Sequence, residues 1–138
     1  MIIAIRISGI VETDTSVEES LFRLRLRRKY SAVLVKPTKE NLILLKQLRS
    51  FIAYGNIDKD TLLLLLEKRA KSQKNKKIDA DYIVSSLDKK SLSDLGIKPF
   101  FRLHPPRGGI DSKIHFGRKK GVLGDNKEKI NLLVRRML

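Results

Sequence analysis

The feature that most constrains this chain is its surplus of positive charge. Lysine and arginine together number 30 against 15 acidic residues, which gives a formal net charge of +15 over 138 residues. Self-repulsion of this size opposes a compact state unless a polyanion neutralises part of it. The sequence therefore predicts a polyanionic partner, either a nucleic acid or an anionic membrane surface.

Several function classes are disfavoured by what the sequence lacks. It has no cysteine, which rules out thiolate catalysis, disulfides and cysteine-based metal sites. The apolar run from Leu62 to Leu66 is far shorter than the ~20 residues that span a bilayer. The last predicted helix has no aromatic anchor, so we expect it to dock on its own protein rather than on a membrane. We therefore expect a cytoplasmic protein with no cofactor, no metal and no small-molecule substrate.

The first part of the chain alternates between strand and helix patterns. Alternating isoleucines predict a strand over residues 2–8, and the β-rich run 31–35 predicts a second strand. Between them we expect a helix over about 15–27, because Thr15 and Glu18 have the spacing of a capping box and leucines recur behind them at helical spacing.

Further helices follow. Thr38 is placed to cap a helix with an apolar face that extends to about residue 52. The run 51–54 fits either the end of that helix or a short third strand. Five consecutive leucines, Leu62 to Leu66, point all round a helix, so we expect that helix to be buried on more than one side.

The last 40 residues combine basic side chains with glycine and proline. Residues 100–103 predict a strand that cannot continue through Pro105 and Pro106, because proline has no backbone donor. We expect an irregular arm or loose hairpin up to Gly124, and a final amphipathic helix over the remaining residues. The charge pattern divides the chain into a core at 1–56, a helical insertion at 57–98 and a basic segment at 99–138.

Two basic clusters are candidates for contacts with phosphate. Arginine alternates with leucine in the cluster from Arg23 to Lys29, and the planar guanidinium group matches phosphate oxygens. The alternative is that these cations only offset the negative end of a helix. The second cluster extends from Arg102 to Lys120 and is interleaved with glycines, which let a backbone approach RNA closely. The alternative for this segment is a solvated loop without RNA contact. For Phe116, which lies within it, packing in the core is the favoured role. The run 68–77 is less specific, since charge runs are usually solvated faces.

An enzymatic role is disfavoured. His104 and His115 are the only histidines, and a pair could act as acid and base in RNA cleavage. The prolines and glycines between them offer no rigid geometry, so packing or polar contact with RNA is the expected role. The spacing of Gly117, Gly121 and Gly124 matches neither known glycine-rich phosphate-binding motif. We therefore expect no enzyme activity.

Several stretches resemble one family of ribosomal proteins. Residues 24–36 and 51–55 are similar to the helix-to-strand turn and third strand of large-subunit ribosomal protein L thirty, called L seven in eukaryotes. Residues 100–109 and 124–138 resemble the signatures of its longer archaeal and eukaryotic members. The sequence begins directly at the first predicted strand, without the basic extension of eukaryotic members, and in this it resembles the archaeal type.

The resemblance implies a fold and a function. It implies an α+β fold: a β-α-β-α-β core with a small three-stranded sheet and two helices on one face, plus a helical and glycine-rich C-terminal extension. It implies a structural, ribosome-bound protein whose partners are large-subunit rRNA, including 5S rRNA, and neighbouring ribosomal proteins. The alternative is a free-standing basic DNA- or RNA-binding regulator outside the ribosome.

The two basic clusters and the resemblance together define the candidate RNA-binding residues. They are Arg25, Arg27, Arg28, Lys29, Lys36, Arg102, His104, Pro106, Arg107, Lys113, His115, Arg118, Lys119 and Lys120.

Overall fold

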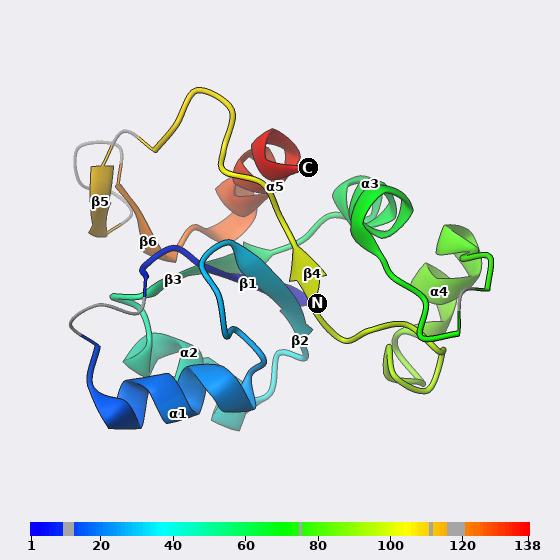
Figure 1. Ribbon diagram of the computed structural model, residues 1–138, viewed down its shortest axis with the longest axis horizontal. Helices are drawn as coiled ribbons and strands as arrows, with labels where there is room; N and C mark the ends of the chain where they lie inside the picture. Colours follow the sequence, from blue (N-terminus) through cyan, green and yellow to red (C-terminus); the bar gives the residue numbers. More distant parts are fainter. Residues whose placement is uncertain (10–12, 75, 111, 116–120) are drawn as a thin grey trace.

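One mixed sheet separates two layers of helices in an α+β arrangement (Figure 1). The structure, a computed structural model, describes residues 1–9, 13–74, 76–110, 112–115 and 121–138. Within these ranges no helix is long and apolar enough to cross a bilayer. The elements in chain order are β1 (Ile2–Arg6), α1 (Thr15–Arg23), β2 (Ser31–Val35), α2 (Lys39–Gln47), β3 (Ile52–Asn56), α3 (Lys59–Arg69), α4 (Ala80–Ser86), β4 (Phe101–Arg102), β5 (Ser112–His115), β6 (Gly121–Asp125), the 3-10 helix η1 (Lys127–Lys129) and α5 (Ile130–Met137).

The sheet is larger than the three strands expected from the sequence. Five strands lie in the order β4-β2-β1-β3-β6, and β5 pairs with β6 beyond them. Strand β1 is antiparallel to both β2 and β3, whereas β3 and β6 are parallel. The prediction of three strands is wrong because the C-terminal segment returns to both edges of the core. It adds β4, within the strand predicted at 100–103, beside β2, and it adds β6 beside β3. Which strands pair over such sequence separations is not visible in local periodicity.

Both faces of the sheet are buried. On one face Ile2 and Ala4 of β1 belong to an apolar cluster with residues of α1 and α2, which confirms that these two helices share a face. On the other face Ile3 and Ile5 belong to a second cluster with residues of α3, α4, α5 and β4. All five residues of β1 are therefore buried, including the charged Arg6.

The helices on the second face bear out the apolar patterns of the sequence. Leu62, Leu65 and Leu66 of α3 are buried and the two leucines between them are half-buried, so the leucine run is covered on more than one side, as expected. The apolar stripe of α5, which contains Leu133 and Val134, is buried in the same cluster. This helix docks on its own protein, as predicted.

A close backbone approach fixes the C-terminal segment against the sheet. A Cβ atom on Gly55 of β3 would collide with the carbonyl oxygen of Lys127 and the side chain of Ile130, so only glycine fits there. Next to this contact the buried Asn131 accepts a hydrogen bond from the backbone N–H of Asp58 at 2.9 Å. The C-terminal helix is thus tied to the end of β3 and to the start of α3.

Several predicted boundaries differ from the structure. Asp14 rather than Thr15 occupies the N-cap position of the first helix, and its side chain forms no capping hydrogen bond, so the predicted capping box is wrong. It ends at Arg23 rather than near residue 27. The run 51–54 belongs mainly to β3, as the family resemblance favours over a helix end. The cap at Thr38 is confirmed, because its side chain accepts a hydrogen bond from the N–H of Asn41. The expected loose hairpin is instead a pair of parallel strands, β5 and β6.

Candidate nucleic-acid interface

The first basic cluster is placed by the way in which α1 ends. Arg25 has a φ of 63°, in the left-handed region that normally favours glycine. Its N–H donates to the carbonyl of Phe22 at 2.9 Å, and the N–H of Leu26 donates to Leu21 at 2.8 Å, the two bonds of a Schellman motif. Leu26 is buried against the core, so the helix stops and the residues that follow form an exposed loop. This explains why the predicted helix is too long.

A fully buried arginine, Arg6, binds the backbone of this loop through hydrogen bonds. One terminal nitrogen of Arg6, Nη1, donates to the carbonyls of Leu26 at 2.8 Å and of Arg27 at 3.1 Å. Its Nε donates to the carbonyl of Ser8 at 3.1 Å, and the other terminal nitrogen donates to that of Gly9 at 3.3 Å. Burial lowers the pKa of this guanidinium from its ordinary value, and the charge of Glu18 acts in the opposite direction. Arg6 of β1 therefore sets the path of the loop. The sequence predicts this strand but not the role of Arg6.

Strand pairing brings the second cluster to the first. Tyr30, also left-handed with a φ of 64°, donates its N–H to the Arg6 carbonyl at 2.7 Å and accepts from the N–H of Leu103 at 3.0 Å. Ser31 pairs with Arg102 in the β2–β4 register. The outcome is one cavity of about 480 Å³, the arginine cleft, which is lined by Arg25, Arg27, Arg28, Ser31, Phe100 and Arg102.

The charges of the arginine cleft are not neutralised by the part of the chain that the structure describes. Arg25, Arg27, Arg28 and Arg102 are exposed, and within the described part of the chain none of them forms an ion pair or a side-chain hydrogen bond. Arg27 lies over the ring of Phe22, with 5.8 Å between its Cζ and the ring centroid. Four guanidinium groups around one opening repel one another, and an anion with several oxygen acceptors relieves that repulsion. The cleft is therefore suited to phosphate.

Two more predicted residues lie near this cleft. The Nζ atom of Lys29 lies 5.0 Å from the centroid of the Tyr30 ring. Lys36 lines a second groove of about 340 Å³ together with Arg23 and Arg25. Arg25 lines both openings, so the groove and the arginine cleft form one basic surface along the end of β2 and the α1–β2 loop.

The proline-glycine signature is fastened to the C-terminal helix. The backbone N–H of Arg107 donates to the carbonyl of Arg136, and Nε of Arg136 donates back to the carbonyl of Arg107, both at 3.0 Å. Arg136 also donates to the carbonyl of Gly109, next to Gly108, which has a φ of 79°. His104 and Arg107 are exposed, whereas Pro106 is buried and supports the turn.

Five predicted residues have no described side chains. Lys113 and His115 lie on β5, of which only the backbone is described. Arg118, Lys119 and Lys120 lie outside the described residues, and so does Phe116.

The sequence reading missed three residues of the interface. Phe100 and Ser31 line the arginine cleft, and Arg6 sets the path of the loop. Only Arg6 carried a usable signal, since a charged residue within an otherwise apolar strand needs a buried partner. Here its partners are backbone carbonyls rather than a carboxylate.

Similar proteins are found among the archaea. A protein of Archaeoglobus fulgidus named large ribosomal subunit protein uL30 is 35% identical over 153 aligned residues, which cover 99% of this chain and 99% of that protein. Proteins of the same name are 34% identical in Methanobrevibacter smithii, with both chains fully covered, and 37% identical in Ignicoccus hospitalis, with 97% of this chain and 95% of the relative covered. No protein-family model matches the chain.

Proposed function

This chain belongs to the uL30 family of large ribosomal subunit proteins, and from that premise we propose that it binds rRNA through the arginine cleft and the basic surface beside it. Its role in the subunit is structural rather than enzymatic. Its partners are large-subunit rRNA and neighbouring ribosomal proteins. The family assignment also decides against a free-standing regulator outside the ribosome.

The observation that carries the proposal is the convergence on one cavity of four arginines that have no ion-pair partner among the described residues. Each guanidinium presents several donors in one plane, which match the oxygens of a phosphodiester. Neutralising phosphates lets RNA helices pack closely, and the release of counterions supplies much of the binding free energy. Phe100 at the same opening offers an apolar surface to a ribose or an unpaired base.

The finer assignments belong to the same proposal. Residues 1–56 act as the rRNA-binding core, residues 57–98 form a helical insertion, and residues 99–138 supply a second basic surface. His104 and Arg107 of that segment are exposed and available to RNA. 5S rRNA is part of the rRNA that we propose as a partner, in line with the longer family members.

Co-sedimentation of the protein with large subunits through a salt series tests the proposal. If about ten basic residues contact phosphates, the logarithm of the affinity should fall with the logarithm of the salt concentration with a slope of roughly −7 to −9. Replacing Arg27 and Arg102 by alanine should flatten the slope by about 1.5. The matched control replaces Lys46 and Lys59, two exposed residues that line neither the arginine cleft nor the second groove. A salt-insensitive association, or equal effects of both pairs, would contradict the proposal.

A further inference from the structure

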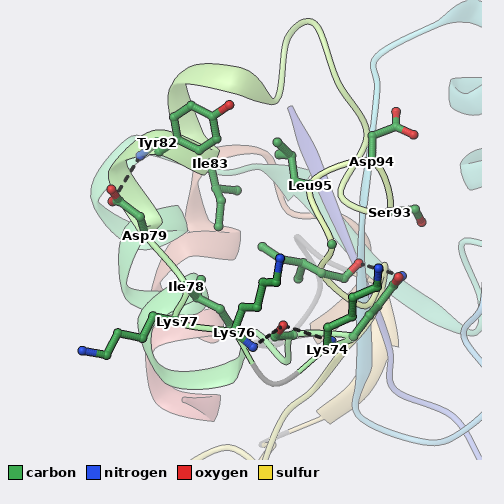
Figure 2. A pocket seen from close by; sticks show the side chains of 14 residues that line it. Lys74, Lys76, Lys77, Ile78, Asp79, Tyr82, Ile83, Ser93, Asp94 and Leu95 are labelled. Carbon is green, nitrogen blue, oxygen red and sulfur yellow. Dashed lines mark hydrogen bonds between the residues drawn. The ribbon is translucent and has the colours of Figure 1, made fainter.

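A cavity in the helical insertion is separate from the arginine cleft. Its volume is about 490 Å³, and its walls are residues 72–74 and 76–79, the start of α4 and the turn at 93–97 (Figure 2). Ile83 and Ile97 are buried beneath it, and Leu95 is half-buried. The half-buried Leu95 and the exposed ring of Tyr82 are therefore the apolar surfaces that a molecule in the cavity can contact, above the two buried isoleucines.

An aromatic ring stands at the rim without a structural task. Tyr82 of α4 is 55% exposed, and its N–H, but not its ring, takes part in the cap formed by Asp79. Figure 2 shows Tyr82 above Ile83, on the wall formed by α4. An exposed aromatic ring beside an apolar side chain is the arrangement on which single-stranded bases stack.

Lysines form the opposite wall. Lys74 and Lys76 line the cavity, and Figure 2 shows both side chains on the wall facing Tyr82, whereas Lys77 points away. Across the residues that the structure describes, neither lysine has an ion-pair partner. Their backbone N–H groups both donate to the hydroxyl of Ser72, at 3.2 and 3.1 Å, which fixes where the two side chains begin.

The two acidic residues of the cavity are already engaged. Asp79 accepts the capping bond from Tyr82 at 3.4 Å, and Asp94 accepts from the N–H of Ser91 at 3.2 Å. Hydrogen bonds from Ser91 lower the pKa of Asp94, which favours its charged form. Fixed carboxylates on two walls disfavour an acidic peptide lying along the cavity. A single nucleotide brings only one phosphate, which Lys74 and Lys76 can bind, and its base is uncharged.

We propose that this cavity binds one unpaired nucleotide of rRNA, with its base on Tyr82 and Leu95 and its phosphate on Lys74 and Lys76. The proposal rests on the proposed function for the identity of the RNA, but it uses none of the residues of the arginine cleft. A cavity of this size is in the range that holds small ligands. It makes the insertion a second point of attachment to the ribosome.

The test compares charge and aromatic variants of the full chain for binding to purified archaeal large-subunit rRNA across a salt series. The double variant Lys74→Ala/Lys76→Ala should weaken binding and flatten the logarithmic salt slope by about one. Tyr82→Leu should weaken binding by at least about fivefold with an unchanged slope, because stacking involves no counterion. The matched control Lys89→Ala/Lys90→Ala removes two exposed charges of the same insertion that do not line the cavity and should have the smaller effect.

Cross-linking gives an independent readout. Large-subunit rRNA containing 4-thiouridine, irradiated with the wild-type protein, should yield a cross-linked peptide that contains Tyr82. Cross-links confined to the α1–β2 loop would overturn the cavity proposal and leave the proposed function standing. Absence of salt-dependent binding by the wild type would instead remove the proposed function. In a competition version of this experiment, oligouridylate should protect Tyr82 from cross-linking and polyglutamate should not; equal protection by both would overturn the cavity proposal. The proposal also fails if the Lys89→Ala/Lys90→Ala control weakens binding as much as the Lys74→Ala/Lys76→Ala variant.

Discussion

Replacing Arg25 by glycine should raise the stability of the fold and lower its affinity for rRNA. Arg25 occupies the left-handed position of a Schellman motif, with a φ of 63°. An L-residue in this conformation destabilises the folded state by about 1–2 kcal/mol, a cost that glycine avoids. Glycine in turn stabilises the unfolded chain by about 0.5–1 kcal/mol through its larger conformational entropy, which offsets part of the gain. A residue kept at such a cost points to a task for its side chain.

The two effects can be estimated separately. The net gain in the free energy of unfolding should be about 0.5–1 kcal/mol, which raises the melting temperature of a chain of this size by about 1–4 °C. The guanidinium of Arg25 forms no hydrogen bond or ion pair among the described residues, so its loss costs the fold little. Loss of one phosphate contact should flatten the logarithmic salt slope of rRNA binding by about 0.8.

Thermal unfolding and rRNA titration over a salt series measure both quantities, and Arg25→Ala is the matched control. Alanine removes the same charge but keeps the strained backbone, so it should lower rRNA affinity as much as glycine does without the gain in stability. Equal melting temperatures of the glycine and alanine variants would refute the backbone argument. An unchanged salt slope in both variants would refute the phosphate contact.

Three further predictions concern the support of the interface. Gly55→Ala should lower the melting temperature by at least about 3 °C in thermal unfolding. The added methyl group would collide with the Lys127 carbonyl, and such overpacking costs about 1–3 kcal/mol. An unchanged melting temperature would show that the C-terminal segment is not held there. Arg6→Lys should speed amide hydrogen exchange over the α1–β2 loop, because one ammonium group cannot serve four carbonyls, and unaltered exchange at Leu26 would count against this role. Burial first, and Asp125 second, raise the pKa of Tyr54 above its ordinary value of 10.0. The unfolded chain therefore loses this proton first, so alkaline unfolding curves should show stability unaffected by Tyr54 below pH 10 and falling above it, and Tyr54→Phe should reduce that fall.

Elements of the fold could be predicted where a single local pattern, such as alternation, a cap or helical spacing, specifies the structure. The strand at 31–35, the cap at Thr38 and the buried stripe of α5 follow from alternation, capping chemistry and helical spacing. The end of α1 could not be found in this way, because glycine is the usual signal for a Schellman motif and Arg25 occupies its place. The strand predicted at 100–103 is present as the two-residue β4, but its pairing with β2 could not be found from local patterns.

The candidate site was predictable as two clusters but not as one. Arginine content identified the loop at Arg25–Arg28 and the segment around Arg102 separately. Their meeting depends on the pairing of Ser31 with Arg102, about 70 residues away along the chain, and long-range pairing leaves no local trace in a sequence. The same reason explains why Phe100 was missed. Arg6 was missed because its partners are backbone carbonyls, which a sequence does not display.

The helices on both sides of the sheet determine how an RNA can approach this protein. Many RNA-binding sheets offer a broad open face on which bases spread out, but here each face is already occupied by apolar side chains. Contact is left to the perimeter, where loops and strand ends emerge. On the binding mode proposed above, the sheet and its two helix layers would therefore set the distance between RNA strands that contact opposite edges of the protein.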